Sequence, residues 1–385
     1  MRLFEHESKR IFKDSGIPVP NGLPIKCLDD LPSTVEKIGL PVAVKAQLPV
    51  GGRAKARGIR FANTLEEALS ETRSLIDEMI GGHRVKSVLI EEKIVARDEY
   101  YLGITIDQLS GVPILMFSTR GGVDVNEIAK ENPEILISRK TNISRGLFQF
   151  EVLDFCRSLG LKGPLLPKVS RILHKLYEVF VRCDAVLAEI NPLLITDEGE
   201  PCAVDAALDI DDNALFRHPD LELDLEMRFQ DEIRIDAARS GLSYVRLDGD
   251  IGVIGSGAGL TMATADLVKD FGGRPANFLE TGGGITEDLM ERAVELVLRD
   301  QRIRALFINL YGGINPMPSA ARGIVRALEK LTPRIPILVK LVGNQQEEAW
   351  GILERAGVPV VRDIQTEKAV AKLMNLYEEY MCASL

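Results

Sequence analysis

A lysine at the end of an apolar run, followed by a basic glycine-rich loop, is the first group of residues that could do chemistry. Lys45 lies in PVAVKAQ, and Gly51-Gly52-Arg53-Ala54-Lys55 follows six residues later, with Gly58 behind it. Glycines let backbone N–H groups approach an oxyanion, and cations offset phosphate charge. The GxxxxGK[ST] spacing of a Walker A loop is absent. The pattern predicts a phosphate-binding loop, and a surface turn with solvated Arg and Lys is the alternative.

Two carboxylates flank a short loop further along the chain. The segment EEKIVARDEYYLG places Glu91 and Glu99 on the ends of consecutive predicted strands. Carboxylates in such positions can accept hydrogen bonds from a ribose or from an adenine amino group. An exposed charged hairpin is the alternative interpretation.

Oxygen ligands gather in AEINPLLIT and CAVDAAL. Residues 186–195 and 202–206 read as two strands joined by the turn DEGE, which would bring Glu189, Asn191 and Asp205 together. Oxygen donors without sulfur or histidine suit Mg²⁺, which binds one or two carboxylates together with phosphate oxygens. The Asn-Pro pair could instead mark only a structural turn.

Three glycine clusters follow predicted strands in the last third of the chain. They are GSGAG (255–259), Thr281-Gly282-Gly283-Gly284 and Gly312-Gly313-Ile314-Asn315. Such junctions mark the carboxyl edge of a parallel sheet, where ligands bind, and the GGG run predicts backbone N–H groups at a helix N-terminus. Glycine at a tight turn between strand and helix is the plainer explanation for some of them. The first cluster reads GxGxG, so it lacks the GxGxxG spacing of a dinucleotide site.

Two different arrangements of elements must position these groups. Up to about residue 240, apolar strands alternate with few helices, among them a helix over 64–80 with Thr64 as its cap, and adjacent strands are expected to be antiparallel. From residue 251 onward, short apolar runs alternate with helical patterns, which predicts a parallel sheet with helices on both faces. The chain is therefore expected to be an α/β protein with an α+β portion, divided into domains 1–240 and 241–385.

Composition narrows the class of protein. The net charge is −10 over 385 residues, which argues against nucleic-acid or membrane-surface binding. No stretch of about 18 apolar residues predicts a membrane span, and the charged N-terminus does not look like a signal peptide. Five widely spaced cysteines, without a CxxC pair, indicate thiols in a reducing compartment. A cytoplasmic location is the expectation.

Several motifs, taken together and in order, resemble one family over nearly the whole chain, namely the beta subunits of succinyl-CoA synthetase (succinate–CoA ligase). The motifs are VKAQLPVGGRAKARGI, STRGGVDVNEIA, LAEINPLLIT, NALFRHPDL, PANFLETGGG and NLYGGI. The resemblance implies an ATP-grasp fold followed by a flavodoxin-like doubly wound domain. It also implies a reaction in which an acid, CoA and a nucleoside triphosphate (ATP or GTP) give acyl-CoA, the diphosphate and phosphate through an acyl phosphate and a phosphohistidine.

The resemblance also assigns roles to individual positions. It implies nucleotide binding by Lys45, Gly52, Arg53, Ala54, Glu91, Ile94 and Glu99, with Ile94 acting through its backbone. It implies Asn191 and Asp205 as Mg²⁺ ligands and Glu189 as the acidic residue that assists the phosphohistidine step. It implies substrate or phosphate contacts by Ser256, Gly283, Gly284, Gly313, Ile314 and Asn315.

A partner is needed under this interpretation. The chain has four histidines, His6, His83, His174 and His218, and none lies in a glycine-flanked loop like the phosphorylated one. A CoA-binding domain also has no counterpart in the sequence. The resemblance therefore implies an alpha subunit that carries the CoA site and the phosphohistidine, in an αβ or (αβ)₂ assembly.

Some positions depart from the family pattern. Ala54 and Arg57 replace glycines of the phosphate loop, Ser256 replaces an Asn, and Pro316 replaces an Arg that could face an acid. The same chemistry on another acid, such as a monocarboxylate, malate or citrate, is therefore an alternative. Two further alternatives are a nicotinamide-dependent oxidoreductase that uses residues 251–284, with Glu280 as the acid that binds the ribose, and a non-catalytic paralogue that binds nucleotide.

Overall fold

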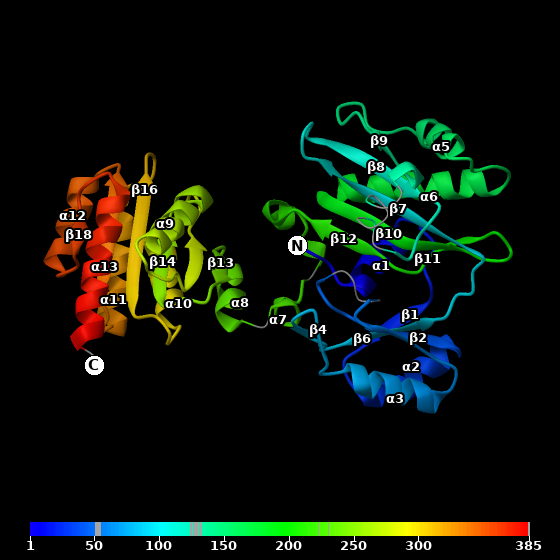
Figure 1. Ribbon diagram of the computed structural model, residues 1–385, viewed down its shortest axis with the longest axis horizontal. Coiled ribbons are helices and arrows are strands. Elements are labelled where there is room, and N and C mark those ends of the chain that lie inside the picture. Colours follow the sequence, from blue (N-terminus) through cyan, green and yellow to red (C-terminus); the bar gives the residue numbers. More distant parts are fainter. Residues whose placement is uncertain are drawn as a thin grey trace. The chain divides into compact units, whose positions relative to one another are not determined.

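The chain forms two compact units in the computed structural model, which describes residues 1–50, 55–123, 125, 130, 133–221, 223–229 and 231–383. Unit 1 is Met1–Asp224 and unit 2 is Leu225–Leu385 (Figure 1). The sequence places the boundary near residue 240, but the chain enters unit 2 before helix α8 (Glu232–Arg239). Ile233 and Ala237 of α8 belong to the apolar core of unit 2, which explains why the boundary lies before α8 rather than near residue 240.

The first sheet of unit 1 has four antiparallel strands in the order β1-β6-β2-β3. These strands are β1 (Gly22–Ile25), β2 (Val42–Ala46), β3 (Ile59–Ala62) and β6 (Val88–Glu92). β2 is buried along its whole length, as suits β-branched and small side chains in a central strand. Helices α2 (Leu31–Ile38) and α3 (Leu65–Leu75) cover this sheet and share one apolar core with it.

Helix α3 begins where the sequence predicts and ends earlier. The Thr64 Oγ1 atom accepts the N–H of Glu67 at 3.2 Å, which is the expected N-cap. The prediction that the helix continues to residue 80 is wrong, because it ends at Leu75 and a short hairpin follows, formed by β4 (Met79–Ile80) and β5 (His83–Arg84). Ile80 reaches the same core as Leu75 from its strand, so the apolar periodicity alone could not locate the end.

The second sheet of unit 1 has six antiparallel strands. The path is β11-β10-β7-β8-β9, and β12 also pairs with β10. The strands are β7 (Asp98–Asp107), β8 (Val112–Ser118), β9 (Leu136–Lys140), β10 (Ala185–Ile195), β11 (Pro201–Ala203) and β12 (Ala207–Ile210). The antiparallel arrangement and the hairpin on either side of residues 197–200 are confirmed. The core of this sheet also takes in α1 (Glu5–Asp14), α5 (Gln149–Ser158) and α6 (Leu165–Arg182).

Unit 2 contains a six-stranded sheet in the order β13-β15-β14-β16-β17-β18. Its strands are β13 (Ser243–Arg246), β14 (Ile251–Gly255), β15 (Asn277–Glu280), β16 (Ala305–Gly312), β17 (Ile337–Gly343) and β18 (Val360–Val361). β13 is an antiparallel edge strand, and the other five strands are parallel. Their order, numbered along the chain, is 2-1-3-4-5, which is the flavodoxin-like arrangement that was expected.

Helices cover both faces of this sheet (Figure 1). They are α9 (Ala258–Asp270) and α13 (Thr366–Ala383) on one face, and α10 (Glu287–Leu298), α11 (Met317–Leu331) and α12 (Gln346–Arg355) on the other. β16 serves both cores by alternation, since Phe307 packs toward α9 and α13 while Leu306 and Ile308 pack toward the opposite layer. Unit 1 ends with the short helical segment η4 (Pro219–Leu221), and unit 2 begins with α7 (Leu225–Arg228) and α8. No helix in the described ranges is both long and apolar enough to cross a bilayer.

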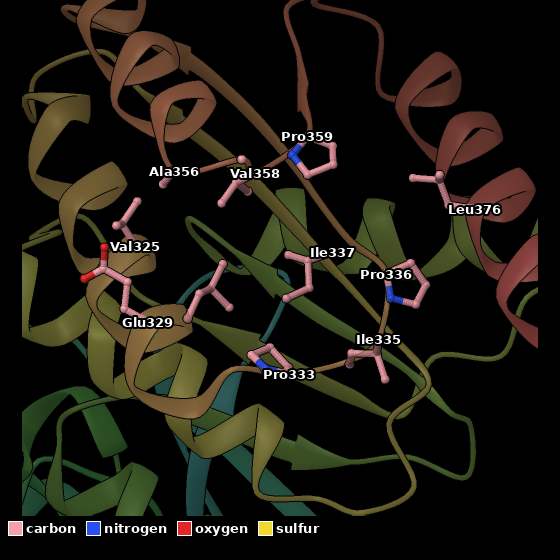
Figure 2. A pocket seen from close by; sticks show the side chains of 12 residues that line it. Val325, Glu329, Pro333, Ile335, Pro336, Ile337, Ala356, Val358, Pro359 and Leu376 are labelled. Carbon is pink, nitrogen blue, oxygen red and sulfur yellow. The ribbon is translucent and has the colours of Figure 1, made fainter.

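A hollow of about 460 Å³ lies at the amino edge of the unit 2 sheet (Figure 2). Its walls are mainly apolar and include Ile337 at the start of β17, Pro359 before β18, and Leu376 on α13. Ligands of open parallel sheets bind at the opposite, carboxyl edge. This hollow is therefore separate from the glycine clusters that the sequence singled out.

Candidate active site

A buried group of charged side chains links the two sheets of unit 1. The Lys45 ammonium, on β2, donates to Glu5 Oε1 at 3.0 Å and forms an ion pair with Glu91 of β6. Lys9, one turn after Glu5 on α1, contacts the same two carboxylates at 2.7 and 2.5 Å. Both ammonium groups also donate to the carbonyl oxygen of Val204, between β11 and β12. These four side chains belong to residues that are at most 5% exposed.

The Lys45 ammonium is held in its charged form. Burial by itself would lower its pKa, but the charges of Glu5, Glu91 and Asp205 hold the pKa above its ordinary value. The influence of Asp205 also places this carboxylate near Lys45. A cation that stays charged beside Asp205 can offset the charge of a phosphate group. The alternative of a solvated surface lysine is wrong for Lys45.

Sequence reasoning missed Lys9 and Glu5. Both lie on α1, and Lys9 approaches Glu91 across 82 positions of sequence. The available signal was a Glu and a Lys four residues apart, which normally indicates a solvated pair on a helix surface. Here the pair is buried and supplies the counter-ions that Lys45 and Glu91 need.

The predicted nucleotide residues Glu91, Ile94 and Glu99 lie on β6, on the loop after it and on β7, where the chain passes from the first sheet of unit 1 to the second. Glu91 is 1% exposed, so the exposed-hairpin interpretation is wrong for this residue. Ile94 is half-buried in the loop that leads from β6 to β7. Glu99 is exposed on β7, and its carbonyl oxygen accepts the N–H of Gly121 at 2.8 Å. Direct contact between the Glu91 carboxylate and a nucleotide stays a prediction, because two lysines already hold that carboxylate.

The residues predicted to surround a metal lie on β10 and on the connection between β11 and β12 in the second sheet. β10 keeps the same antiparallel register to both of its partners, pairing Glu189 with Ala207 of β12 and Leu193 with Ala203 of β11. Asp205 lies in the connection between β11 and β12, and these two strands pair with β10 on either side of Asn191. The pairing of β10 with β7 shifts register between Ile190 and Leu193. The fold therefore brings the backbone segments that carry the three predicted residues to neighbouring parts of the sheet.

Asn191 is oriented by the loop that follows β8. Its Oδ1 atom accepts the N–H of Gly122 at 2.8 Å, and its Nδ2 atom donates to the Val123 carbonyl oxygen at 2.9 Å. The amide oxygen keeps a second lone pair, and Asp205 accepts from the N–H of Ala206 through Oδ1. An amide oxygen and a carboxylate, both half-buried, fit the oxygen preference of Mg²⁺. No group of three acidic, His or Cys side chains that could hold a metal occurs within the described ranges.

Part of the predicted phosphate loop lies outside the described residues, namely Gly51, Gly52, Arg53 and Ala54. The described remainder of the loop includes Arg57, which has a left-handed backbone with a φ of 56°. The resemblance expected glycine there, and an L-residue in this conformation costs roughly 1–2 kcal/mol. The backbone of Arg57, which replaces a glycine of the family pattern, is therefore strained.

In unit 2, Ser256 and the third glycine cluster meet at the carboxyl edge of the sheet. The Ser256 hydroxyl donates to the Tyr311 carbonyl oxygen at 3.0 Å and accepts the Tyr311 N–H at 2.7 Å. It thereby extends the pairing of β14 with β16 by one step beyond Gly255 and Asn309. Gly313 and Ile314 are exposed just beyond β16, with Ile314 91% exposed.

The second glycine cluster joins the same edge through Asn315, whose Nδ2 donates to the carbonyl oxygen of Gly283. Gly283 and Gly284 are exposed in a turn that precedes the helix. The GGG run lies between β15 and the helix, as the sequence predicts, and Thr286 is the N-cap of α10 and accepts the N–H of Leu289 at 3.2 Å. The N-terminus of α9, by contrast, follows Gly257 without a side-chain cap.

Each of the two units corresponds to a known protein family. The ATP-grasp domain family matches residues 2–195, and the CoA-ligase family matches residues 254–374. The ADP-forming succinate–CoA ligase beta subunit of Ignicoccus hospitalis is 42% identical over 94% of this chain and 95% of its own. The GDP-forming beta subunit of Thermus thermophilus is 39% identical, over 97% and 99%. The chain belongs to the succinate–CoA ligase beta-subunit family.

This membership confirms the resemblance and the predicted fold. An ATP citrate lyase from Methanothrix soehngenii, solved with citrate and coenzyme A, has the same fold, with a TM-score of 0.79 at 18% identity over 97% of this chain and 99% of that one. The oxidoreductase alternative loses support, because the full-length relatives are beta subunits of the ligase family. Glu280, its proposed ribose ligand, instead accepts the N–H of Gly282 at 2.7 Å.

Proposed function

We propose that this succinate–CoA ligase family member is the nucleotide-binding subunit of an acid–CoA ligase that uses Mg²⁺ with ATP or GTP. The observation that carries the proposal is the meeting of Lys45 with the Val204–Asp205 segment, which lies between two strands that pair with β10 on either side of Asn191. It sets a charged ammonium group near the Asp205 carboxylate and on the same sheet as the Asn191 amide. Such a set suits the triphosphate of a nucleotide bound with its metal.

Each residue has a distinct part in this proposal. Lys45 offsets phosphate charge, and Lys9 with Glu5 and Glu91 fixes its position. Asn191 and Asp205 hold Mg²⁺, which neutralises charge on the transferring phosphoryl group when it is bound. Glu189 lies on the same strand as Asn191 and can accept a hydrogen bond from the N–H of an incoming imidazole.

A partner subunit completes the site in this proposal. It carries the CoA site and the histidine that accepts the phosphoryl group, as the resemblance implies, in an αβ or (αβ)₂ assembly. Of the four histidines in this chain, His174 and His218 donate from Nε2 within unit 1, to the Leu147 carbonyl oxygen and to Asp184 Oδ2 respectively. One ring nitrogen of each is thus engaged in a structural contact.

The acid is proposed to be succinate, as the names of the relatives suggest, with a less charged acid as a second candidate. The described loops that follow β14, β15, β16 and β17 at the carboxyl edge of unit 2 are 255–259, 281–286, 312–316 and 343–346, and they contain no Lys or Arg. The loop after β18 contains Arg362, which is paired with Glu354. A second carboxylate would therefore receive no cation from the first four loops. Amide and backbone donors, such as Asn315 and Gly313, remain to bind an acid there.

The nucleotide half is tested by Asp205→Asn in the full chain, combined with an alpha partner. We expect the concentration of Mg·ATP at half-maximal phosphohistidine formation to rise about tenfold or more, because a charge-assisted contact is lost. Asp197→Asn, at the exposed tip of the same hairpin, is the matched control and should behave as wild type. Unchanged kinetics in Asp205→Asn would remove this residue from the metal site.

The acid half is tested by a coupled assay of the same pair over succinate, malate, citrate and monocarboxylates of two to five carbons. Highest kcat/KM with succinate supports the first candidate, and highest kcat/KM with a monocarboxylate supports the second. Nucleotide binding without turnover of any acid would favour the non-catalytic paralogue.

A further inference from the structure

A tyrosine on β7 has a buried hydroxyl group that nothing in the described protein satisfies. Tyr101 is 0% exposed, and its hydroxyl has no hydrogen-bond partner among the described residues. An unsatisfied buried hydroxyl is destabilising, and phenylalanine would fill the same space without this penalty. Packing therefore explains the ring of Tyr101 and leaves its oxygen without a structural purpose.

The position of Gly103 shows where this hydroxyl points. A Cβ atom built on Gly103 would lie 2.3 Å from the Tyr101 hydroxyl oxygen, so the phenol extends along β7 and covers the glycine. Only a residue without a side chain leaves room for it. Gly103 is the register partner of Glu189 on the neighbouring strand β10 (Figure 1).

Strand geometry then places the phenol and the carboxylate on the same side of the sheet. Tyr101 and Gly103 are two residues apart on one strand, so they share a face. Gly103 and Glu189 are directly opposed on antiparallel strands, so they share that face as well. The Tyr101 hydroxyl thus lies at the level of Glu189, on the same side of the sheet.

The phenol is a donor in this setting. Burial, with the nearby charge of Glu189 as a second cause, raises the pKa of Tyr101 well above its ordinary value. Its proton therefore stays in place at neutral pH. A protonated phenol that faces an anionic site can donate one hydrogen bond to a carboxylate or to a phosphoryl oxygen.

We propose that Tyr101 is a positioning residue. When the site is loaded, its hydroxyl donates a hydrogen bond to one oxygen of Glu189, and the other oxygen of Glu189 accepts the N–H of the partner's imidazole. This inference rests on the proposed function, because it needs the phosphohistidine step. It explains why an unsatisfied hydroxyl persists in the core of unit 1 and why Gly103 leaves room for it. Enzymes commonly keep a residue that lowers stability at a reactive site when that residue supports activity.

The test uses the full chain with its alpha partner and compares Tyr101→Phe with Tyr100→Phe. Tyr100 is the neighbouring residue of β7, points to the other face and is also largely buried, at 9% exposed, which makes it a matched control. Tyr101→Phe should slow single-turnover phosphohistidine formation about tenfold to a hundredfold, the range of one hydrogen bond to a charged group. The KM for Mg·ATP should stay within about twofold of wild type, because no nucleotide contact is lost. Tyr100→Phe should leave both quantities unchanged.

A double variant separates positioning of Glu189 from other effects of the hydroxyl. In a Glu189→Gln background, Tyr101→Phe should cause no further slowing, since residues that act through one another are non-additive. Full additivity, a wild-type rate in Tyr101→Phe, or a change confined to the KM for Mg·ATP would each overturn the inference. An inactive wild-type pair would instead contradict the proposed function.

The thermal midpoint of the free chain supplies a second measurement. Tyr101→Phe should be at least as stable as wild type, because it removes the unsatisfied hydroxyl. A slower reaction together with an unchanged or higher midpoint supports a functional role for the oxygen. A lower midpoint would mean that the hydroxyl has a structural partner, and would overturn the inference.

Discussion

Lys45 and Glu91 form an ion pair between neighbouring antiparallel strands of unit 1, and both residues are almost completely buried. They are diagonal neighbours, because Lys45 is opposite Leu89 and Glu91 is opposite Ala43. Lys9 and Glu5 close the cluster, so two cations meet two carboxylates. The balance matters because a buried charge without a partner is far more costly than a buried pair.

The first prediction concerns Glu91→Gln. It leaves two buried ammonium groups with one carboxylate, and we expect the free energy of unfolding of unit 1 to fall by about 3–5 kcal/mol. Urea denaturation followed by far-UV circular dichroism measures the loss. The only tryptophan, Trp350, lies in unit 2, so its fluorescence transition should stay in place. Glu66→Gln, an exposed change on α3, is the control, and an equal effect in both variants would contradict the expected cost.

The second prediction uses two glycines with the same backbone conformation. Gly122 and Gly146 have φ of 71° and 78°, so alanine is strained at both. Only at Gly122 would the new Cβ atom meet a functional group, since it would lie 2.4 Å from Glu99 Oε2. Gly122→Ala should therefore weaken nucleotide binding by about tenfold, while Gly146→Ala should not change it. Titration of the full chain with a fluorescent ATP analogue in the presence of Mg²⁺ checks this.

Wild-type affinity in both variants would mean that the Glu99 carboxylate does not contact the nucleotide. Equal losses in both would mean that backbone strain, rather than Glu99, controls the affinity. Because the Gly122 N–H also donates to Asn191 Oδ1, a loss confined to Gly122→Ala supports a role for Glu99 together with Asn191.

Local patterns in the sequence were sufficient for the elements that hold the site. The apolar run around Lys45, the hairpin that carries Asn191 and the strand–glycine junction at Ser256 follow from periodicity and turn residues over a few positions. Each pattern is local because neighbouring residues determine it. The strands and helices could therefore be predicted locally, whereas the ATP-grasp and flavodoxin-like folds came from the family resemblance, and the family matches agree with them.

Contacts between distant segments could not be predicted in this way. Lys9 reaches Glu91 only because α1 packs beside both sheets, and an isolated Glu–Lys pair on a helix carries no sign of burial. Tyr101 was passed over for the same reason, since an apolar strand accounts for its ring.

The third prediction compares two glycines inside helices of unit 2. A Cβ atom on Gly323 of α11 would lie 2.3 Å from the Glu287 carbonyl oxygen, whereas one on Gly351 of α12 would meet only the end of Arg355, at 3.3 Å. Gly323→Ala should lower the free energy of unfolding by about 1–3 kcal/mol through overpacking. Gly351→Ala should raise it by roughly 0.5–1 kcal/mol, because alanine is the better helix former. Calorimetry of the full chain measures both, and effects of the same sign would contradict the packing.

The fourth prediction separates the acid half of the site from the nucleotide half. Ser256→Ala removes two hydrogen bonds to the backbone of Tyr311, which hold the start of the loop with Gly313 and Ile314. Because that loop belongs to the proposed acid site, we expect the KM for the acid to rise about threefold to tenfold, from the net strength of neutral hydrogen bonds.

The KM for Mg·ATP should stay constant in Ser256→Ala, since the proposed nucleotide residues lie in unit 1. Steady-state kinetics of the full chain with its alpha partner measure both constants. Ser243→Ala, an exposed position on the edge strand β13, is the control and should change neither. If the two constants rose together in Ser256→Ala, the loop after β16 would act on the whole catalytic cycle, and its assignment to the acid would be wrong.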